Sequence, residues 1–215
     1  MITVDLSQIN IILLLVFLLI VMSFHEAMHA FTSHWLGDDT ALREGRLSLN
    51  PLKHIDPFAT IILPAITLLF FHFPLLAAKP VPFNPNRVKY DEFGAALVGI
   101  AGPLSNLFLA LLAALFLHGA ASHLSLGVIN ALGFFVWLNL ALFVFNMIPF
   151  PPLDGSRLLY AFAPEPLQKV MYAIEGFGLM AIFIFILVLI PVIGPIMTRT
   201  ILSLSHLLRL NIVGI

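Results

Sequence analysis

The sequence contains no cysteine among its 215 residues, which excludes disulfides, iron–sulfur clusters and thiolate zinc sites. Any bound metal must therefore use histidine and carboxylate side chains. Charged residues are also scarce, at 10%, whereas a soluble globular domain carries about 25%. The formal net charge of −1 provides no basic excess for binding nucleic acid. These shortages exclude soluble enzymes and nucleic-acid-binding proteins.

Long apolar runs dominate the sequence instead. Five of them approach or exceed the length of about 18 residues that a transmembrane helix needs. They are Ile9–Phe24, Phe58–Ala78, Phe93–His118, Val128–Phe150 and Phe177–Ile196. No stretch between them is long enough for a soluble domain, and no internal repeat is found. We therefore expect an all-α polytopic membrane protein, with residues 1–215 forming a single domain.

The limits of these runs predict the helices. We expect helices over 8–36, 93–118, 128–150 and 172–197, and a segment that enters and leaves the same side of the membrane over 58–78. In the tail 198–215, basic side chains alternate with leucines, which is typical of an amphipathic helix at the membrane surface.

A metal-binding pattern lies inside the first expected helix. His25-Glu26-Ala27-Met28-His29 is an H-E-x-x-H run, and helical positions i and i+4 share one face. Both imidazoles can therefore bind one ion, and Glu26 lies where a carboxylate can reach a metal-bound water. Because polar groups are costly inside a membrane, we interpret this cluster as a functional metal site, against the alternative of helix-packing histidines.

Two histidines leave a zinc site incomplete, so a third ligand must come from elsewhere in the chain. Asp154 follows an apolar run that ends in several prolines, and these must break the helix. Unwound backbone inside a membrane is tolerated where it lines protein or a wet cavity. Asp154 is therefore the candidate third ligand. The other nearby acid, Glu175, is interpreted as an interfacial residue.

Three motifs, in this order, resemble those of the site-2 proteases, which are intramembrane zinc metalloproteases. They are the H-E-x-x-H run at 25–29, Gly102-Pro103-Leu104-Ser105-Asn106, and Asn146-x-x-Pro-x-Pro-x-Leu-Asp154-Gly155. The resemblance runs from about residue 12 to residue 157. The sequence resembles the short prokaryotic members of the family, because it contains no inserted PDZ or CBS domain. It implies a site-2-protease-like helical core.

The resemblance also implies the roles of the metal-site residues. His25, His29 and Asp154 would bind one zinc ion per chain. Glu26 would be the general base that activates the zinc-bound water for attack on the scissile carbonyl.

The resemblance further implies the substrate and two more functional residues. Asn146 and Asn106 would bind the substrate backbone or the oxyanion. For Asn106, a hydrogen bond between packed helices is the alternative. The implied activity is hydrolysis of peptide bonds within or near transmembrane segments of membrane proteins, as in regulated intramembrane proteolysis. The identity of the substrate and the oligomeric state, a homo-oligomer included, stay open.

The distribution of lysine and arginine helps to decide the topology. If 58–78 spans the membrane, the ten basic residues divide five against five. If it re-enters, eight of them share one side, in loops 37–57, 79–92 and 151–171. Prolines within 58–78 also fit a broken segment. We therefore expect re-entry, an outside N-terminus and an active site that opens toward the cytoplasm of a prokaryotic cell.

Two loop segments are predicted to offer short β edge strands. Residues 45–50 alternate polar and apolar side chains, and the proline-rich segment 79–85 must be extended. A substrate helix must unwind near the scissile bond, and pairing with an edge would satisfy its freed backbone groups. Segment 45–50 is the favoured edge, and a plain loop is the alternative.

The remaining polar residues receive structural interpretations. Asn130 and Asn139 are assigned to helix packing, and Arg157 is assigned to anchoring at the membrane surface. Arg157 lies just beyond Asp154, so a contact that supports the metal ligands is the alternative for it. The other histidines have no second ligand at metal spacing.

Two other classes of protein remain as alternatives. A membrane metal-ion transporter is one, since buried histidine and aspartate also mark ion pathways. Transporters commonly contain two related halves, and none are detected here. A catalytically idle protein that binds membrane helices is the other. Zinc itself rests on ligand type and resemblance, because the affinity order of divalent ions does not select it.

Overall fold

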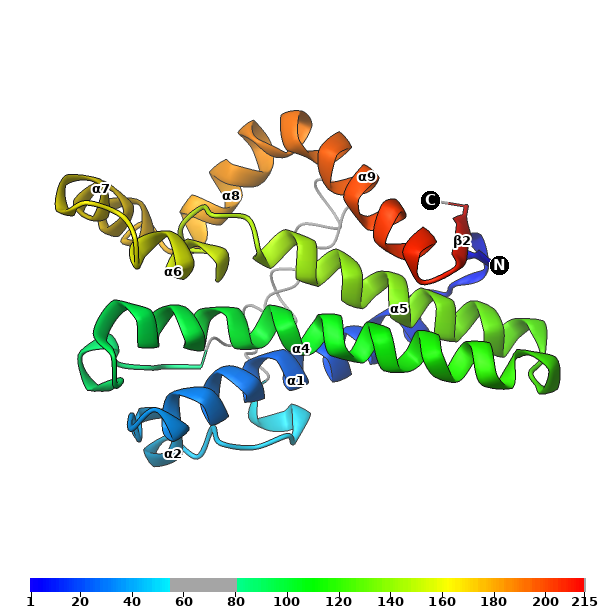
Figure 1. The fold of residues 1–215 in the computed structure, drawn as a ribbon, viewed down its shortest axis with the longest axis horizontal. Helices are drawn as coiled ribbons and strands as arrows, with labels where there is room; N and C mark the ends of the chain where they lie inside the picture. Colours follow the sequence, from blue (N-terminus) through cyan, green and yellow to red (C-terminus); the bar gives the residue numbers. More distant parts are fainter. Residues whose placement is uncertain (55–80, 215) are drawn as a thin grey trace.

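The computed structural model describes residues 1–54 and 81–214, and within these ranges the chain is mainly helical (Figure 1). Three of the described helices are long and apolar enough to cross a membrane. They are α1 (Ile11–Trp35), α4 (Asp91–Ala120) and α5 (Leu126–Asn146). The expected re-entrant segment 58–78 lies outside the described residues.

Helix α4 is central, because it contacts α1, α5 and the short α6 (Gly155–Tyr160). Small residues make this close packing feasible, as is common between membrane helices. Ala110 and Ala114 of α4, for example, are buried in a core cluster with Val136 and Leu140 of α5. The centre of α4 thus lies between the helix that carries the H-E-x-x-H run and the segment that carries Asp154.

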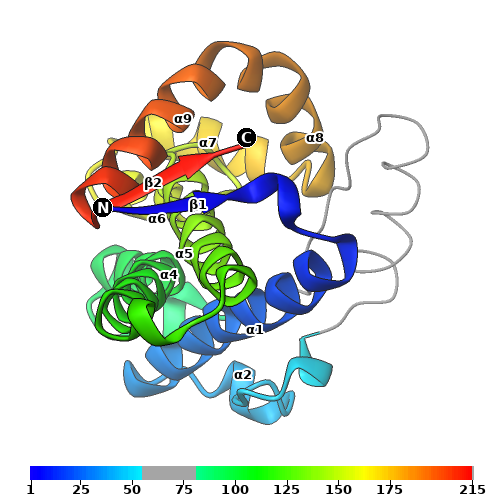
Figure 2. The ribbon, with the colours of Figure 1, turned by 90° about the vertical axis from the view of Figure 1, so that its right-hand side faces the viewer.

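Two strands are found in the described residues, and they pair the N-terminal segment of the chain with the C-terminal segment. Strand β1 (Ile2–Asp5) pairs in parallel with β2 (Leu210–Val213), with Ile2 opposite Leu210. Figure 2 shows this pair between α9 and α5. The expectation of a strand at 45–50 is wrong, since these residues form a turn and irregular backbone. Alternation over six residues does not by itself supply a partner strand.

The C-terminal part differs from the single helix expected over 172–197. It forms α7 (Glu165–Glu175), α8 (Leu179–Val188) and α9 (Ile190–Leu207). The break after α7 contains two glycines, and Gly178 has φ of +54°, a conformation that favours glycine. The tail 198–215 is also not one helix, because α9 ends at Leu207 and β2 follows.

Proline sets the end of α5. The predicted helix 128–150 ends four residues early, at Asn146. Pro149, Pro151 and Pro152 cannot donate backbone hydrogen bonds, so the chain turns there and re-forms a helix at α6. The remaining short elements are η1 (Leu6–Gln8), α2 (Thr40–Arg43), η2 (Pro51–Lys53), η4 (Pro85–Arg87) and η5 (Ala121–His123).

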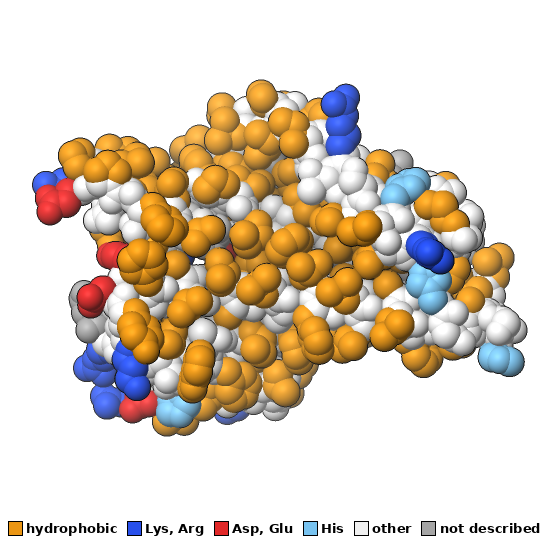
Figure 3. Space-filling view, in the orientation of Figure 1, with side chains coloured by type: hydrophobic (Ala, Val, Ile, Leu, Met, Phe, Trp, Pro, Cys, Tyr) orange, Lys and Arg blue, Asp and Glu red, His pale blue; other side chains and the backbone are white. Residues whose placement is uncertain are grey.

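The surface agrees with a lipid environment. Hydrophobic side chains cover most of the face drawn in Figure 3, and large ones are strongly exposed, such as Ile12 at 71% and Leu115 at 72%. Charged side chains gather at the end that carries α2 and α7 (Figures 1 and 3). An apolar flank with a charged end is the pattern expected of a protein embedded in a bilayer.

Candidate metal centre

The structure brings His25, His29 and Asp154 together, although 129 residues separate the first from the last. His25 Nε2 lies 3.0 Å from His29 Nε2 and 2.9 Å from Asp154 Oδ2, and His29 Nε2 lies 3.4 Å from Asp154 Oδ2. Both histidines are buried, with 8% of each residue exposed. The helical i, i+4 spacing aligns the histidines, and the turn after α5 supplies the carboxylate.

This donor set fits a zinc ion. Ligands on a tetrahedral zinc with bonds of about 2.0–2.1 Å lie about 3.3 Å apart, close to the three separations here. All three ligand atoms lie within 4.8 Å of one another. Three protein ligands leave one position of a tetrahedral ion for water or substrate, as in catalytic zinc sites.

Glycine at position 102 makes room for this arrangement. A Cβ at Gly102 would collide with Nε2 of both His25 and His29. A Cβ at Gly99, one turn away on α4, would lie 3.0 Å from the Asp154 carbonyl and closer to the Arg157 side chain. These two glycines let α1 and α6 approach the same face of α4, which is the geometric condition for the site.

Both imidazoles are also held at their second ring nitrogen. His29 Nδ1 lies 2.7 Å from the Val98 carbonyl, which can only accept a hydrogen bond. The proton of neutral His29 is therefore on Nδ1, and its Nε2 lone pair faces the other ligands. His25 Nδ1 lies 2.5 Å from Asn106 Oδ1. Such contacts fix the ring orientation of metal-binding histidines.

Glu26 is held by the loop that precedes α4. Its Oε2 accepts a hydrogen bond of 2.8 Å from the backbone N–H of Val81. Val81 packs with Ala30 and Ala41, so the loop lies against α1 and α2. One carboxylate oxygen is thus bound, and no hydrogen bond from residues 1–54 or 81–214 is found for the second, which is the oxygen expected to accept a proton. No sequence signal identified Val81, because the contact depends on a loop distant in sequence.

The two asparagines implied by the resemblance have different surroundings. Asn106 is 0% exposed, and its amide contacts His25 and Asn139, so it supports the imidazole and does not face a substrate. Asn146 ends α5 and donates to the Leu142 carbonyl of its own helix at 3.1 Å. Within the described residues, no hydrogen bond joins Asn146 to the three ligands.

Arg157 and Glu175 have a role that the sequence did not predict. Arg157 of α6 forms an ion pair with Glu175, and the Tyr160 hydroxyl donates to the same carboxylate at 3.1 Å. Burial and the Glu175 carboxylate raise the pKa of Tyr160 well above its usual value, so the hydroxyl remains a donor. Neither Arg157 nor Glu175 is merely interfacial, since together they join α6, which follows Asp154, to α7.

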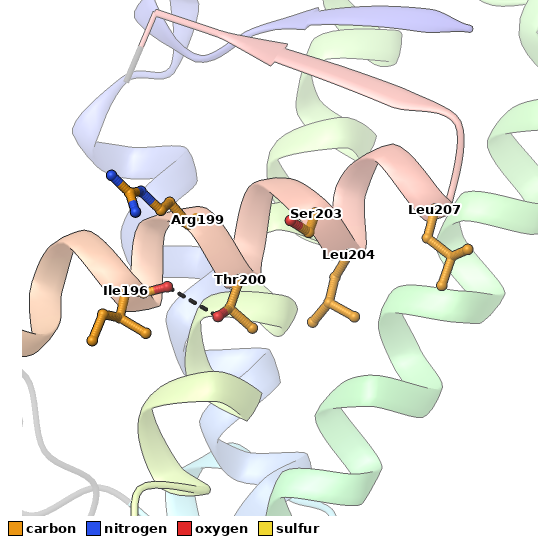
Figure 4. Close-up of a pocket in the computed structure, with 6 residues that line it drawn as sticks. All are labelled: Ile196, Arg199, Thr200, Ser203, Leu204 and Leu207. Atoms are coloured by element: carbon orange, nitrogen blue, oxygen red, sulfur yellow. Dashed lines mark hydrogen bonds between the residues drawn. The ribbon is translucent and has the colours of Figure 1, made fainter.

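A shallow hollow, separate from the metal centre, lies along helix α9. It is lined by Ile196, Arg199, Thr200, Ser203, Leu204 and Leu207, all of α9 (Figure 4). The Thr200 hydroxyl donates to the Ile196 carbonyl at 2.9 Å, so it serves the helix itself. The hollow shares no residue with the metal centre. It displays the mixed polar and apolar face expected near the tail.

The structure thus combines helices of membrane-spanning length with an H-E-x-x-H run that lies against a carboxylate. These features define the class as a membrane protein with a metalloprotease-like site. The family model for Peptidase family M50 matches residues 118–190. "Putative zinc metalloprotease YwhC" of Bacillus subtilis is 38% identical over 183 residues, which cover 82% of this chain and 78% of the relative.

More distant relatives agree. "Putative zinc metalloprotease Rip2" is 26% identical in Mycolicibacterium smegmatis, covering 85% of this chain and 67% of the relative. In Mycobacterium tuberculosis it is 28% identical, covering 82% and 66%. No solved structure gives a significant match. The chain therefore belongs to Peptidase family M50, the site-2 proteases, and is an intramembrane zinc metalloprotease.

Proposed function

We propose that the chain hydrolyses peptide bonds within or near transmembrane segments of membrane proteins, with His25, His29 and Asp154 as zinc ligands and Glu26 as general base. The observation that carries this proposal is the convergence of the three ligand atoms, with Glu26 directly following the ligand His25 in the same helix. Zinc bound by such ligands lowers the pKa of water to about 7 and polarises a carbonyl. The large hydrophobic side chains exposed on α1 and α4 support a substrate that is itself embedded in the membrane.

The protein groups divide the proton transfers and the positioning. Glu26 accepts a proton from the attacking water and returns it to the leaving amine. The Val81 N–H, 2.8 Å from Oε2, fixes the carboxylate so that its other oxygen can take this proton. The contact of His29 with Val98 keeps the imidazole lone pair directed at the metal position.

Asn146 is proposed to stabilise the oxyanion. One of its two amide hydrogens is used by the Leu142 carbonyl, and no acceptor for the second is found in the described ranges 1–54 and 81–214, so we assign it to a substrate oxygen. Removing one such donor costs about 10²–10³ in kcat. The half-buried position at the end of α5, eight residues before Asp154, supports this assignment.

The active site is proposed to open toward the cytoplasm of a prokaryotic cell. The ends of α1 and α6 and the start of α4 lie at the same charged end of the molecule (Figures 1 and 3). The described parts of the loops 37–57, 79–92 and 151–171 contain Arg43, Arg46, Lys53, Arg87, Lys89, Arg157 and Lys169. An excess of positive charge favours the cytoplasmic side. The bacterial origin of the named relatives supports the prokaryotic assignment.

The decisive experiment compares the purified wild-type protein with Glu26→Gln and Glu44→Gln in detergent. Metal content per chain and cleavage of a panel of single-span membrane segments are measured for each. Glu44 is exposed and follows α2, so Glu44→Gln is the matched control for loss of one carboxylate. We expect zinc in all three proteins, and cleavage by wild type and Glu44→Gln alone.

Other outcomes would reject parts of the proposal. Cleavage by Glu26→Gln at the wild-type rate would remove Glu26 as the base. Absence of bound metal from every variant, after exposure to zinc, would reject the ligand set. Metal without cleavage by wild type, together with metal transport into vesicles, would favour a transporter.

A further inference from the structure

Two buried amides lie behind His25 and connect three helices. Asn106 of α4 and Asn139 of α5 are both 0% exposed. Asn106 Oδ1 lies 2.5 Å from His25 Nδ1, and Asn106 Nδ2 donates to Asn139 Oδ1 at 3.3 Å. Asn139 Nδ2 in turn donates to the Phe135 carbonyl at 2.8 Å. These hydrogen bonds form a chain from the Phe135 carbonyl of α5, through Asn139 and Asn106, to the His25 imidazole of α1. We call this chain of hydrogen bonds the relay.

The carbonyl at the far end sets the direction of the whole relay. A carbonyl only accepts, so Asn139 must present its NH₂ group to Phe135 and its oxygen to Asn106. Asn106 must then present its NH₂ group to Asn139 and its oxygen to His25. Because this oxygen also only accepts, the His25 proton must be on Nδ1. The Nε2 lone pair of His25 is thereby left facing Asp154 and His29.

The reversed relay would be unfavourable. Turning both amides over would bring the Asn139 oxygen against the Phe135 carbonyl oxygen, and it would break a buried hydrogen bond where no water can replace it. It would also present the Asn106 NH₂ group to His25 Nδ1 and move the imidazole proton to Nε2. A protonated Nε2 cannot bind a metal ion.

The two histidines are therefore oriented by different means. The Val98 carbonyl contacts His29 directly at 2.7 Å, and a backbone oxygen cannot be turned over. His25 depends on Asn106, whose amide can be reversed unless a neighbour prevents it. Asn139 is that neighbour, although its hydrogen bonds within the described part of the chain join it to Asn106 and Phe135 and to none of the metal ligands.

We propose that Asn139 is a positioning residue that selects the metal-binding tautomer of His25 through Asn106. This inference rests on the proposed zinc ligands and deepens that proposal. It gives Asn139 a function beyond the helix packing expected from the sequence.

The test measures zinc affinity by competition with a chromophoric chelator. Asn139→Leu keeps a similar side-chain volume and leaves the Asn106 amide without its partner. We expect zinc binding to weaken by about 10- to 100-fold, the usual effect of losing a group that orients a metal ligand. The matched control is Asn130→Leu, because Asn130 is also a buried asparagine of α5 but accepts from the Asp5 N–H at 3.1 Å. The control should bind zinc like wild type.

A second pair of variants separates positioning from general destabilisation. In Asn106→Asp both side-chain oxygens are acceptors, so turning the group over changes nothing. Asn139→Leu should therefore have little further effect on zinc affinity in the Asn106→Asp background. If it weakens binding equally in both backgrounds, the loss is structural and the inference is overturned.

The tautomer of His25 in the metal-free protein can be measured directly by ¹⁵N NMR of histidine-labelled samples. The signals of His25 are assigned as those that disappear in His25→Gln. We expect the proton on Nδ1 in wild type and a population with the proton on Nε2 in Asn139→Leu. Wild-type zinc affinity in Asn139→Leu, or an unchanged tautomer, would overturn this inference alone. Failure of wild type to bind zinc would instead reject the proposed zinc site.

Discussion

The Glu26 carboxylate and the Val81 backbone N–H lie 2.8 Å apart, although 55 residues separate them in the sequence. The contact holds the proposed base with a backbone group that every substitution at position 81 except proline retains. Only the loop backbone, placed by the packing of Val81 against α1 and α2, supplies this donor. The position of the base is therefore a property of the fold beyond the H-E-x-x-H helix.

Replacing Val81 tests this contact. Val81→Pro removes the N–H, and we expect kcat to fall about tenfold, the scale of one hydrogen bond to a charged group, with zinc content unchanged. Steady-state cleavage of a membrane substrate, paired with metal analysis, measures both quantities. Val81→Ala retains the N–H and trims only the side chain, so it should stay closer to wild type. Equal kcat in the two variants would argue against a role for the N–H.

Gly102 is predicted to be required for full zinc affinity. A Cβ there would collide with both imidazoles, so Gly102→Ala should weaken zinc binding by at least about tenfold. Gly119 lies on the same helix with open space around its Cβ position, and Gly119→Ala is the control. Because alanine is the better helix former, the control should bind zinc normally and unfold no more easily than wild type. Normal zinc affinity in Gly102→Ala would show that α1 and α4 can separate without loss of the site.

Zinc should stabilise the folded protein through Asp154. Free zinc at 100 times its Kd adds about 2.7 kcal/mol to the free energy of unfolding, so thermal unfolding in detergent should move to higher temperature. Asp154→Asn should abolish this increase because it replaces a ligand carboxylate. Asp39→Asn, which changes an exposed carboxylate paired with His34, should retain it. A zinc-dependent increase in Asp154→Asn would exclude Asp154 as a principal ligand.

The ion pair between Arg157 and Glu175 is expected to stabilise the position of α6, and with it the position of Asp154 in the metal centre. The two side chains are 18% and 29% exposed, so Glu175→Gln leaves Arg157 partly buried without its charge partner. We expect a loss of about 1–3 kcal/mol in the free energy of unfolding and weaker zinc binding. Glu165→Gln, at the exposed start of α7, should cost less than about 1 kcal/mol.

A double-mutant cycle with Arg157→Met separates the pair from its surroundings. If the ion pair acts as a unit, the double variant should be more stable than the sum of the single effects predicts. Simple additivity would assign the effects to contacts other than the pair, such as the Arg157 guanidinium over the Phe83 ring.

Much of the fold class and of the candidate site was predictable because its signals are local. Apolar runs of membrane length depend only on consecutive residues, and they located α1, α4 and α5. The i, i+4 spacing of His25 and His29 places them on one helical face without reference to other elements. The prolines after Asn146 required a turn, which made Asp154 a candidate ligand.

The remaining features depend on contacts between distant segments, which local patterns do not contain. A six-residue alternation suggested a strand at 45–50, yet strands form at the two termini, where β1 and β2 provide partners for each other. Asn106 carries the same amide whether it faces substrate or an imidazole, and the packing of α4 against α1 decided for the imidazole.

The sequence by itself therefore determined a helical membrane protein and predicted a metal site of histidine and carboxylate side chains. The tertiary structure alone decided how that site is held. Val81 binds Glu26, Val98 binds His29, and Asn139 reaches His25 through Asn106. The physical reason is that hydrogen bonds across packed helices are selected by three-dimensional proximity and by the direction of donors and acceptors, neither of which is encoded in the spacing along one helix.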